Sequence, residues 1–500
     1  MNLSWLIKSE SYKRGMALSV VFNIVAKFLL FLLTICIARL FGTNIKTDIY
    51  FFIYSSMVLF SGSVNAIDTA VIIPESMQIR ETQGHDAATA FLNYFIRVYL
   101  FIGILFIAMI AIFGPGIFGV ISKFSQSDIN TYENYFFIGS CCFLFQILIN
   151  YFNAILISLK YFTVPMIISG INSCIVIAGS LLLYRQYDIL SVLISGLAAY
   201  FINFIFLVYI LKKTAGWNFL ICKKRIDKKV WGKLFFSEFG QMATLAGSYF
   251  PLYILSGFNN GVISAMNYGK NIADIPNTLL TAQVANVSGV KMNEQAARNE
   301  LDGLNGTFMR SSKLLVFLLV PAGFFMFVFA QPIVALFYKT GNFTDSAVVE
   351  SARFLQLLAV TIFSIAVNAM VTRIFIAMQI IRQAFFYKIM MNGLLIAAIW
   401  LFSKYHGAYG YPYGVIFMNT VNFLAMSFIC KRFFKTIEYN NLLKYTALII
   451  LINLPVAAIL SYTLPLTNLF YLYKLLIGFC IYLAVMIFTN RIKKLKIVWL

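Results

Sequence analysis

Residues 17–48 read ALSVVFNIVAKFLLFLLTICIARLFGTNIKTD, an apolar run that is long enough to cross a bilayer as one helix. Its polar side chains Ser19, Asn23, Lys27 and Thr34 recur at spacings of four, four and seven residues, so they share one helical face. A lysine near the middle of a membrane helix costs a few kcal/mol or more when it faces lipid, so it normally faces protein or water. The stretch therefore predicts a membrane protein with a polar cavity beside its first helix.

The composition extends this prediction to the whole chain. Of the 500 residues, 61% are hydrophobic and only 11% are charged, and the mean hydropathy is +0.84, which excludes a soluble protein. The apolar runs are continuous rather than alternating, which favours helices over a transmembrane barrel. We predict fourteen spans, at residues 15–40, 48–73, 90–114, 133–158, 164–184, 189–211, 233–257, 262–289, 307–330, 351–378, 385–403, 407–430, 443–463 and 469–489.

The net charge of +21 is concentrated in short loops on one side of these spans. This bias predicts a multi-pass membrane protein with both termini in the cytoplasm, and it argues against nucleic acid as a partner. The basic loop at 217–233 combines Trp217 with Lys223, Lys224 and Arg225, so we expect an interfacial helix on the anionic inner leaflet. A nucleic-acid or protein contact at this loop is the alternative.

An internal repeat relates the two halves of the chain. The segment FGPGIF at 113–118 and the segment QPIV at 331–334 each precede a lysine, an aspartate and an apolar span, at an offset of a little over two hundred residues. The offset equals six spans, so the repeats would run parallel. The predicted fold is all-α and polytopic, with two pseudo-symmetric six-helix lobes around a central cavity and two appended helices. The expected domains are 1–211 (first lobe), 212–232 (basic amphipathic linker), 233–435 (second lobe) and 436–500 (appended spans).

Polar residues concentrate in the first two spans of each lobe. In the second lobe these include Gln241, Lys270, Asn271 and Asp274, and the spacing of four predicts an ion pair between Lys270 and Asp274. Helix packing is the alternative role for the serines and threonines, and a structural pair is the alternative for Lys27.

Catalytic and nucleotide-binding patterns are missing from the sequence. The two histidines, His85 and His406, lie in predicted loops, and no glycine-rich phosphate loop is present, so we expect a transporter rather than an enzyme. We expect no cofactor and no bound metal. Transport would then be driven by the membrane potential, an ion gradient or the gradient of the substrate.

Several short motifs resemble the MurJ/MviN family of the multidrug/oligosaccharidyl-lipid/polysaccharide (MOP) exporter superfamily. They are ARLFG at 38–42 with Asp48 after it, AVIIPE at 70–75, NYGKN at 267–271 and FYKTGNFT at 337–344. The resemblance implies a flippase that moves a lipid-linked saccharide from the inner to the outer leaflet by alternating access of two lobes. It also implies cationic residues in the cavity that hold the diphosphate of the substrate.

The resemblance places several residues at family positions. Lys27 stands where the family has an arginine in the first span, Arg39 closes that span, and the family arginine of the eighth span aligns with Asn271, next to Lys270. Leu33 stands where the family has a second arginine, so the cavity is expected to be less basic than in lipid II flippases. The predicted substrate-binding residues are Lys27, Asn23, Asp48, Lys270, Asn271, Gln241 and Arg39.

The expected substrate is a polyprenyl-diphosphate-linked saccharide, and the sequence leaves open whether this is lipid II or a surface-polysaccharide repeat unit. Two other functions remain as alternatives. One is a cation-coupled multidrug exporter of the same superfamily, and the other is a membrane polymerase or ligase of the same lipid-linked sugars.

Overall fold

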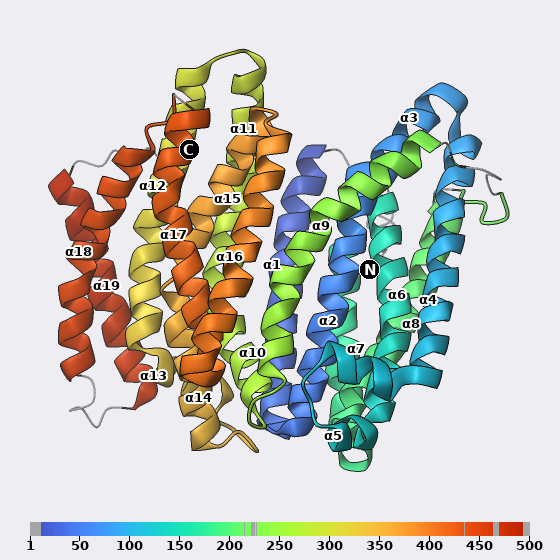
Figure 1. The fold of residues 1–500 in the computed structure, drawn as a ribbon, viewed down its shortest axis with the longest axis horizontal. Helices are drawn as coiled ribbons and strands as arrows, with labels where there is room; N and C mark the ends of the chain where they lie inside the picture. Colours follow the sequence, from blue (N-terminus) through green and yellow to red (C-terminus); the bar gives the residue numbers. More distant parts are fainter. Residues whose placement is uncertain are drawn as a thin grey trace. The chain divides into compact units, whose positions relative to one another are not determined.

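The structure, a computed structural model, describes residues 12–214, 216–221, 226, 228–434, 436–463 and 470–493, and every regular element in these residues is a helix (Figure 1). The chain forms two compact units, Met1–Ile263 (unit 1) and Ser264–Leu500 (unit 2). The helix at Lys228–Leu255, which we expected in the second lobe, packs against the helix at Ile45–Ile67 within unit 1. The lobe boundary near 232 stays a prediction.

Unit 1 has long helices that run side by side, as α4, α6 and α8 do in Figure 1. Its elements are α1 (Tyr12–Phe41), α2 (Ile45–Ile67), η2 (Asp68–Ile72), α3 (Ile73–Gln83), α4 (His85–Ile121), α5 (Gln126–Thr131), α6 (Glu133–Ser158), α7 (Val164–Tyr187), α8 (Leu190–Thr214) and α9 (Lys228–Leu255).

Unit 2 begins within a helix and continues to the end of the described chain. Its elements are α10 (Val262–Ala273), η3 (Asn277–Thr281), α11 (Ala282–Ala297), α12 (Leu301–Val328), α13 (Ala330–Tyr338), α14 (Asp345–Ala359), α15 (Ile362–Ala377), α16 (Ile381–His406), η4 (Gly407–Tyr409), α17 (Gly410–Phe433), α18 (Tyr439–Thr463) and α19 (Tyr471–Lys493).

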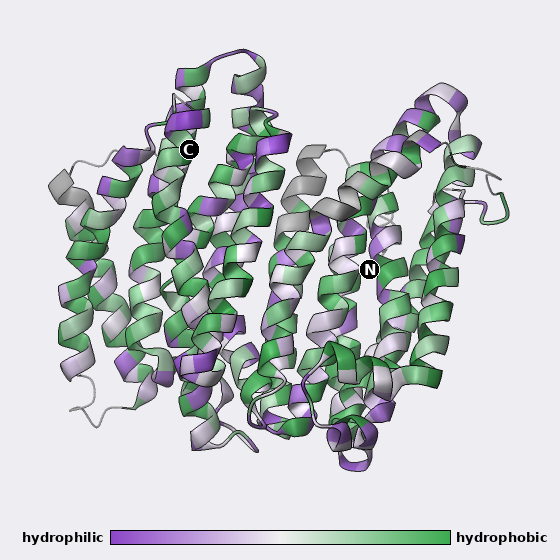
Figure 2. Ribbon diagram, viewed as in Figure 1, coloured by the Kyte–Doolittle hydropathy of each residue, from purple (hydrophilic) through white to green (hydrophobic). Residues whose placement is uncertain are grey.

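The helices confirm a polytopic membrane protein. Apolar residues cover the middle of the helices and hydrophilic residues gather at their ends (Figure 2). Within the described residues, ten helical segments are long and apolar enough to cross a membrane, or eleven when the bent pair α14–α15 is one span. All fourteen predicted spans fall largely on helical residues, but the count of fourteen is not confirmed. These segments do not include α9 or α10–α11, and residues 382–433 (α16 and α17) count as one.

The two units repeat one order of packing. α3 packs on α4 and α7 packs on α8 in unit 1, as α11 packs on α12 and α16 packs on α17 in unit 2. Each unit has a five-residue π-turn: η2 separates α2 from α3, and η3 lies between α10 and α11. The π-turns start 209 residues apart, at Asp68 and Asn277, in agreement with the predicted repeat.

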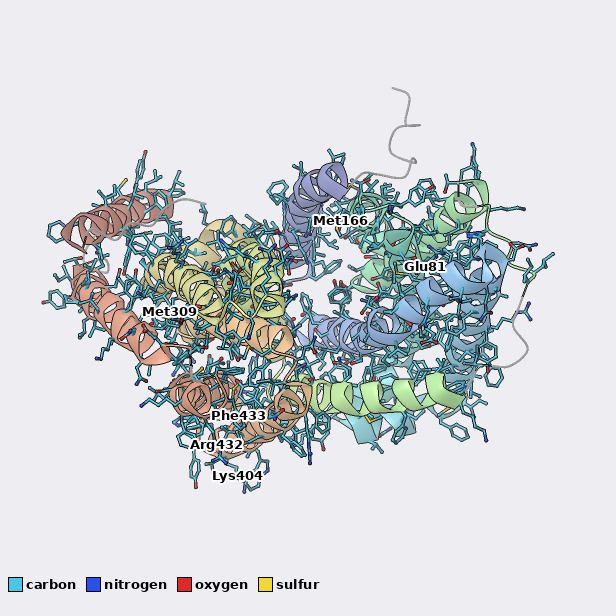
Figure 3. All side chains as sticks on the ribbon, turned by 90° about the horizontal axis from the view of Figure 1, so that it is seen from above. Glu81, Met166, Met309, Lys404, Arg432 and Phe433 are labelled. Atoms are coloured by element: carbon cyan, nitrogen blue, oxygen red, sulfur yellow. The ribbon has the colours of Figure 1, made fainter. Side chains whose placement is uncertain are left out.

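Each unit has its own apolar core. In unit 1 the core joins α4, α6 and α8, with Phe91, Tyr151 and Leu207 almost fully buried. In unit 2 the core joins α12, α15 and α18, and Met309 lies inside this bundle, whereas Lys404 lies at its margin (Figure 3). These cores fix the long helices on which the polar residues are carried.

The loop after α8 differs from the expected interfacial helix. Residues 216–221 are not helical, and Trp217 is only 3% exposed. The physical reason is Asn93 of α4: its Oδ1 accepts from Trp217 Nε1 at 2.9 Å, and its Nδ2 donates to the carbonyls of Asn218 and Ile221 at 2.7 Å each. The prediction of a helix from Trp217 is therefore wrong for this part, and residues 222–225, including Lys223, Lys224 and Arg225, lie outside the described residues.

Candidate functional site

Lys27 lies on the exposed side of α1. Ala26 and Leu33, which are 4% and 6% exposed, belong to the buried side of α1, and α1 packs against α7. Lys27 is exposed and has no ion-pair partner among the described residues, and Asn23 one turn earlier is half-buried. The ammonium group of Lys27 is therefore available to an anion. The Ser19 side chain of the predicted stripe lies outside the described residues.

The charged residues at the end of α1 and the start of α2 have different surroundings. Arg39 in the last turn of α1 is exposed. Asp48 is 2% exposed, and its Oδ2 accepts a hydrogen bond from the Gly261 backbone amide at 2.6 Å. A hydrogen bond to a carboxylate at this burial stabilises the chain by about 1.5–3 kcal/mol. Asp48 thus anchors the turn after α9 to the first turn of α2.

A capping box places Asp48 for this contact. Asn44 is the N-cap of α2, and its side chain accepts from the Thr47 amide at 3.1 Å, while the Thr47 hydroxyl accepts from the Asn44 amide at 2.8 Å. Asparagine and threonine at these positions satisfy backbone amides that the helix leaves unbonded. The helix start, and with it Asp48, is fixed by local sequence.

Lys270 forms the ion pair that its spacing predicts. Lys270 Nζ lies 3.3 Å from Asp274 Oδ2, and the two side chains are 46% and 47% exposed. A half-exposed pair four residues apart on a helix contributes only about 0.3–0.5 kcal/mol, so a stronger anion can replace Asp274. Asn271 beside Lys270 is half-buried.

Gly269 sets the position of Lys270 through close packing. A Cβ atom at Gly269 would lie 2.5 Å from the Ser351 carbonyl oxygen and 2.8 Å from the Leu355 nitrogen. Both are backbone atoms of α14, so α10 approaches α14 more closely than any other residue would allow. The backbone next to Lys270 is therefore held rigidly.

Two of the family-like motifs meet at this contact. The ring of Tyr268 lies 5.1 Å from the ring of Tyr338 and 5.2 Å from that of Phe343. Tyr268 and Tyr338 are fully buried, and Phe343 is 3% exposed. NYGKN and FYKTGNFT therefore form one aromatic cluster that supports α10, which explains both motifs by packing.

An ion pair within the second motif's loop joins its two ends, just before α14. Lys339 Nζ lies 2.6 Å from Asp345 Oδ1, and the hydrogen bond to this carboxylate raises the pKa of Lys339. Thr344 caps α14, because its hydroxyl accepts from the Ala347 amide at 3.3 Å. These exposed contacts shape the loop and leave no cation unpaired there for a substrate.

The predicted binding residues divide between the two units. Lys27, Asn23, Arg39 and Asp48 lie in unit 1, together with the half-buried Gln241 of α9, and Lys270 and Asn271 lie in unit 2. Their joint role in one site stays a prediction.

Arg373 is a cation of unit 2 that the predicted set of binding residues omits. Its NH2 group donates to Asn286 Oδ1 of α11 at 2.6 Å, and its Cδ would lie 3.0 Å from a Cβ at Gly289. The side chain therefore lies across α11 with a neutral partner, and no acidic residue in the described part of the chain forms an ion pair with it. The signal in the sequence is an arginine within the predicted tenth span.

An apolar groove crosses unit 2. It has a volume of about 800 Å³ and lies between α12, the α14–α15 break, α17 and α18. Val360 and Thr361, which line it, are the two residues of the break, where the helix axis bends by 44°. Most of the other lining residues are apolar, among them Phe324, Leu424 and Leu454, and the polar ones are Lys444 and four residues with hydroxyl groups.

Comparison with known proteins identifies the relatives of this chain. A probable lipid II flippase MurJ of Borreliella burgdorferi (strain B31) is 20% identical over 375 residues, which are 73% of each protein. A lipid II flippase MurJ in an inward closed conformation has a TM-score of 0.77 at 18% identity, over 94% of this chain and 99% of that chain. An inward-facing multidrug resistance transporter of the MATE family has a TM-score of 0.65 at 11% identity, over 89% of this chain and 96% of that chain.

The similarity to the MATE transporter shows a shared fold only. The family model described as "Lipid II flippase MurJ" matches residues 37–482, which cover most of both units. The chain therefore belongs to the MurJ lipid II flippase family.

Proposed function

We propose that this protein is a flippase, not an enzyme, that moves a polyprenyl-diphosphate-linked saccharide from the inner to the outer leaflet of the bacterial inner membrane. The family match over residues 37–482 carries the proposal, and the apolar helices agree with a multi-pass membrane protein. Both termini would be cytoplasmic, as the loop charges indicate. The saccharide is that of lipid II or of a surface-polysaccharide repeat unit.

In this proposal the cations hold the diphosphate. Lys27 has no ionic partner among the described residues, and the pair of Lys270 with Asp274 is weak, so both ammonium groups are available to phosphate oxygens. A lysine that faced lipid at the depth of Lys27 would cost several kcal/mol, which favours a wet cavity beside α1. Asn23, Gln241 and Asn271 would contact the sugar or phosphate through amide groups.

The groove in unit 2 fits the lipid tail. A polyprenyl chain is an unbranched apolar ligand, and a groove of about 800 Å³ with apolar walls removes a large part of it from water. α18 lines the groove, together with α12, α15 and α17, whereas no α19 residue does so. The tail would therefore lie against α18 and the α14–α15 break.

Energy would come from the membrane potential, an ion gradient or the substrate gradient, and no cofactor would be required. We retain the anionic inner leaflet as a partner of residues 217–233 through the basic residues of this loop, since Trp217 itself is buried. Multidrug export is less well supported, because the charge at the middle of the first span is a lysine, which repels cationic drugs.

Flipping of a fluorescently labelled lipid II in proteoliposomes tests the proposal. Lys27→Ala should slow flipping about tenfold to a hundredfold, as the loss of one charged hydrogen bond of about 1.5–3 kcal/mol predicts. Lys404→Ala is the matched control, because Lys404 is an exposed lysine in the last turn of α16, where its Nζ lies 3.6 Å from the centre of the Trp400 ring. Equal rates for Lys27→Ala and the wild type would remove Lys27 from the mechanism. Absence of flipping by the wild type, of both lipid II and a polysaccharide repeat unit, would contradict the proposed function.

A further inference from the structure

Asp68 is a fully buried carboxyl group in the middle of a membrane-spanning segment. It is the first residue of the π-turn η2, and it is 0% exposed. The Tyr99 hydroxyl of α4 donates a hydrogen bond to Asp68 Oδ1. Asp68 Oδ2 is buried and has no hydrogen-bond partner.

An ionised carboxylate would be expensive at this place. Transfer of a charged group into an apolar interior costs several kcal/mol unless the group is paired and hydrogen-bonded. Among the described residues, no cation forms an ion pair with Asp68, and the only donor is one hydroxyl. The neutral acid, in which Oδ2 carries a proton, avoids this cost.

The described residues around Asp68 supply no ion-pair partner. Tyr151 of α6 lies near Asp68, with its ring 5.2 Å from that of Tyr99, but its hydroxyl donates to the Leu92 carbonyl at 3.1 Å. Glu75 of α3, two turns further along, is the next acidic group on the same segment. α9 also packs on η2, and its Lys233 and Glu238 side chains lie outside the described residues.

The second unit provides a natural comparison. Its π-turn η3 begins with Asn277, a permanently neutral amide of almost the same shape as a carboxylic acid. Asn277 Oδ1 accepts from the Thr281 hydroxyl at 2.8 Å, so this π-turn is satisfied without a titratable group. Unit 1 thus places a titratable residue where unit 2 has a neutral one.

The location gives a proton at Asp68 a mechanical consequence. π-turns are rare, and they recur at functional positions of helices. η2 joins α2 to α3 and packs against α6 and α9. An ionised Asp68 would need water or new donors, and these can enter only if the helices around η2 move apart.

We propose that Asp68 is a proton-binding site that couples the flippase cycle to a proton. In the state described, Oδ2 holds the proton; on release, the O–H bond breaks, its electron pair stays on Oδ2, and the proton passes to water on the side where α3 ends. Release accompanies opening of the α2–η2–α3 segment, and rebinding restores the packed state. The coupling to transport rests on the proposed flippase function, whereas proton binding does not.

The site is tested first without substrate. Infrared difference spectra of the purified protein, recorded between about pH 5 and about pH 9, should contain the carbonyl band of a buried protonated carboxylic acid. Asp68→Asn should remove this band, while Asp86→Asn, which changes an exposed aspartate at the start of α4, should retain it. Identical spectra for the wild type and Asp68→Asn would overturn the proton site.

Flipping of labelled lipid II in proteoliposomes then tests the coupling. Asp68→Asn imitates the protonated state and should slow flipping at least about tenfold at every pH. Flipping by the wild type should slow when the solution on the side of the membrane where α3 ends is acidified. Tyr99→Phe removes the donor to Oδ1 and should move the pH of half-maximal rate upward, whereas Asp86→Asn, which changes an exposed carboxylate, should leave this pH unchanged. A wild-type rate and pH profile for Asp68→Asn would refute the coupling. A wild type that has the infrared band but flips no substrate would refute the proposed function and leave the proton site supported.

Discussion

Replacement of Gly269 by alanine tests how rigidly the structure holds α10. The new Cβ would lie 2.5 Å from the Ser351 oxygen, 2.8 Å from the Leu355 nitrogen and 3.0 Å from Phe354 Cβ. The first two are backbone atoms, so a side-chain rotation cannot relieve the overlap, and α10 must move away from α14 by several tenths of an ångström or more. Overpacking of this kind costs about 1–3 kcal/mol.

Thermal unfolding of the purified protein measures this cost. For a unit of about 240 residues, each kcal/mol lowers the midpoint by roughly 2–4 °C, so we expect a decrease of about 2–12 °C for Gly269→Ala. Gly306→Ala in α12 is the matched control, since its added Cβ would have no atom of another helix within 4 Å. Alanine is a better helix former than glycine by about 1 kcal/mol, so this control should be neutral or stabilising.

The same pair of variants also reports on function. Gly269→Ala shifts the backbone that carries Lys270, so flipping should fall by more than the loss of folded protein explains, whereas Gly306→Ala should retain the wild-type rate. Equal midpoints for the two variants would refute the close approach of α10 to α14.

Two further predictions concern Asp48 and the groove. Asp48→Ala should lower the free energy of unfolding by about 1.5–3 kcal/mol, because it removes the hydrogen bond from the Gly261 amide to the carboxylate. Asp48→Asn keeps an acceptor oxygen, so this variant should unfold near the wild-type midpoint. Slow flipping by a stable Asp48→Asn would instead show a role in substrate binding. Ala447→Trp, which fills the groove, should slow flipping of a full-length polyprenyl substrate more than flipping of a short-chain analogue. Leu451→Trp, on the exposed side of α18, should slow flipping of neither substrate. Equal effects of the two variants on both substrates would contradict tail binding in the groove.

Features with a local cause could be predicted from the sequence. The helices follow from apolar runs, and the pair of Lys270 with Asp274 follows from a spacing of four. Contacts between distant parts of the chain could not be predicted. Trp217 looked like an interfacial anchor, yet its indole binds Asn93, 124 residues earlier. Hydropathy does not report such a partner, because a tryptophan at an interface and one buried beside an asparagine have the same local pattern.

The groove and the π-turns had no sequence signal for a different reason. The groove walls come from four segments, and its shape depends on the 44° bend at Val360 and Thr361, which neither glycine nor proline marks. A π-turn changes the hydrogen-bond register of a few residues and leaves the composition of the span unaltered. Asp68 was therefore visible in the sequence only as one polar residue among several, and its isolation emerged from the packing of α4 and α6 around it.

In the proposed function, cations of both units hold the diphosphate of the substrate. Lys27, Lys270 and Arg373 lack a strong acidic partner in the described residues, as a site for an anionic diphosphate requires. A diphosphate bound by such cations carries charge across the membrane potential, and each elementary charge moved across 100 mV corresponds to about 2.3 kcal/mol. If a proton is released at Asp68 in the same cycle, the net charge that crosses the membrane per cycle changes by one elementary charge. The measured dependence of flipping on membrane potential should therefore differ between the wild type and Asp68→Asn by about one elementary charge, and equal dependence would show that the proton and the substrate move independently.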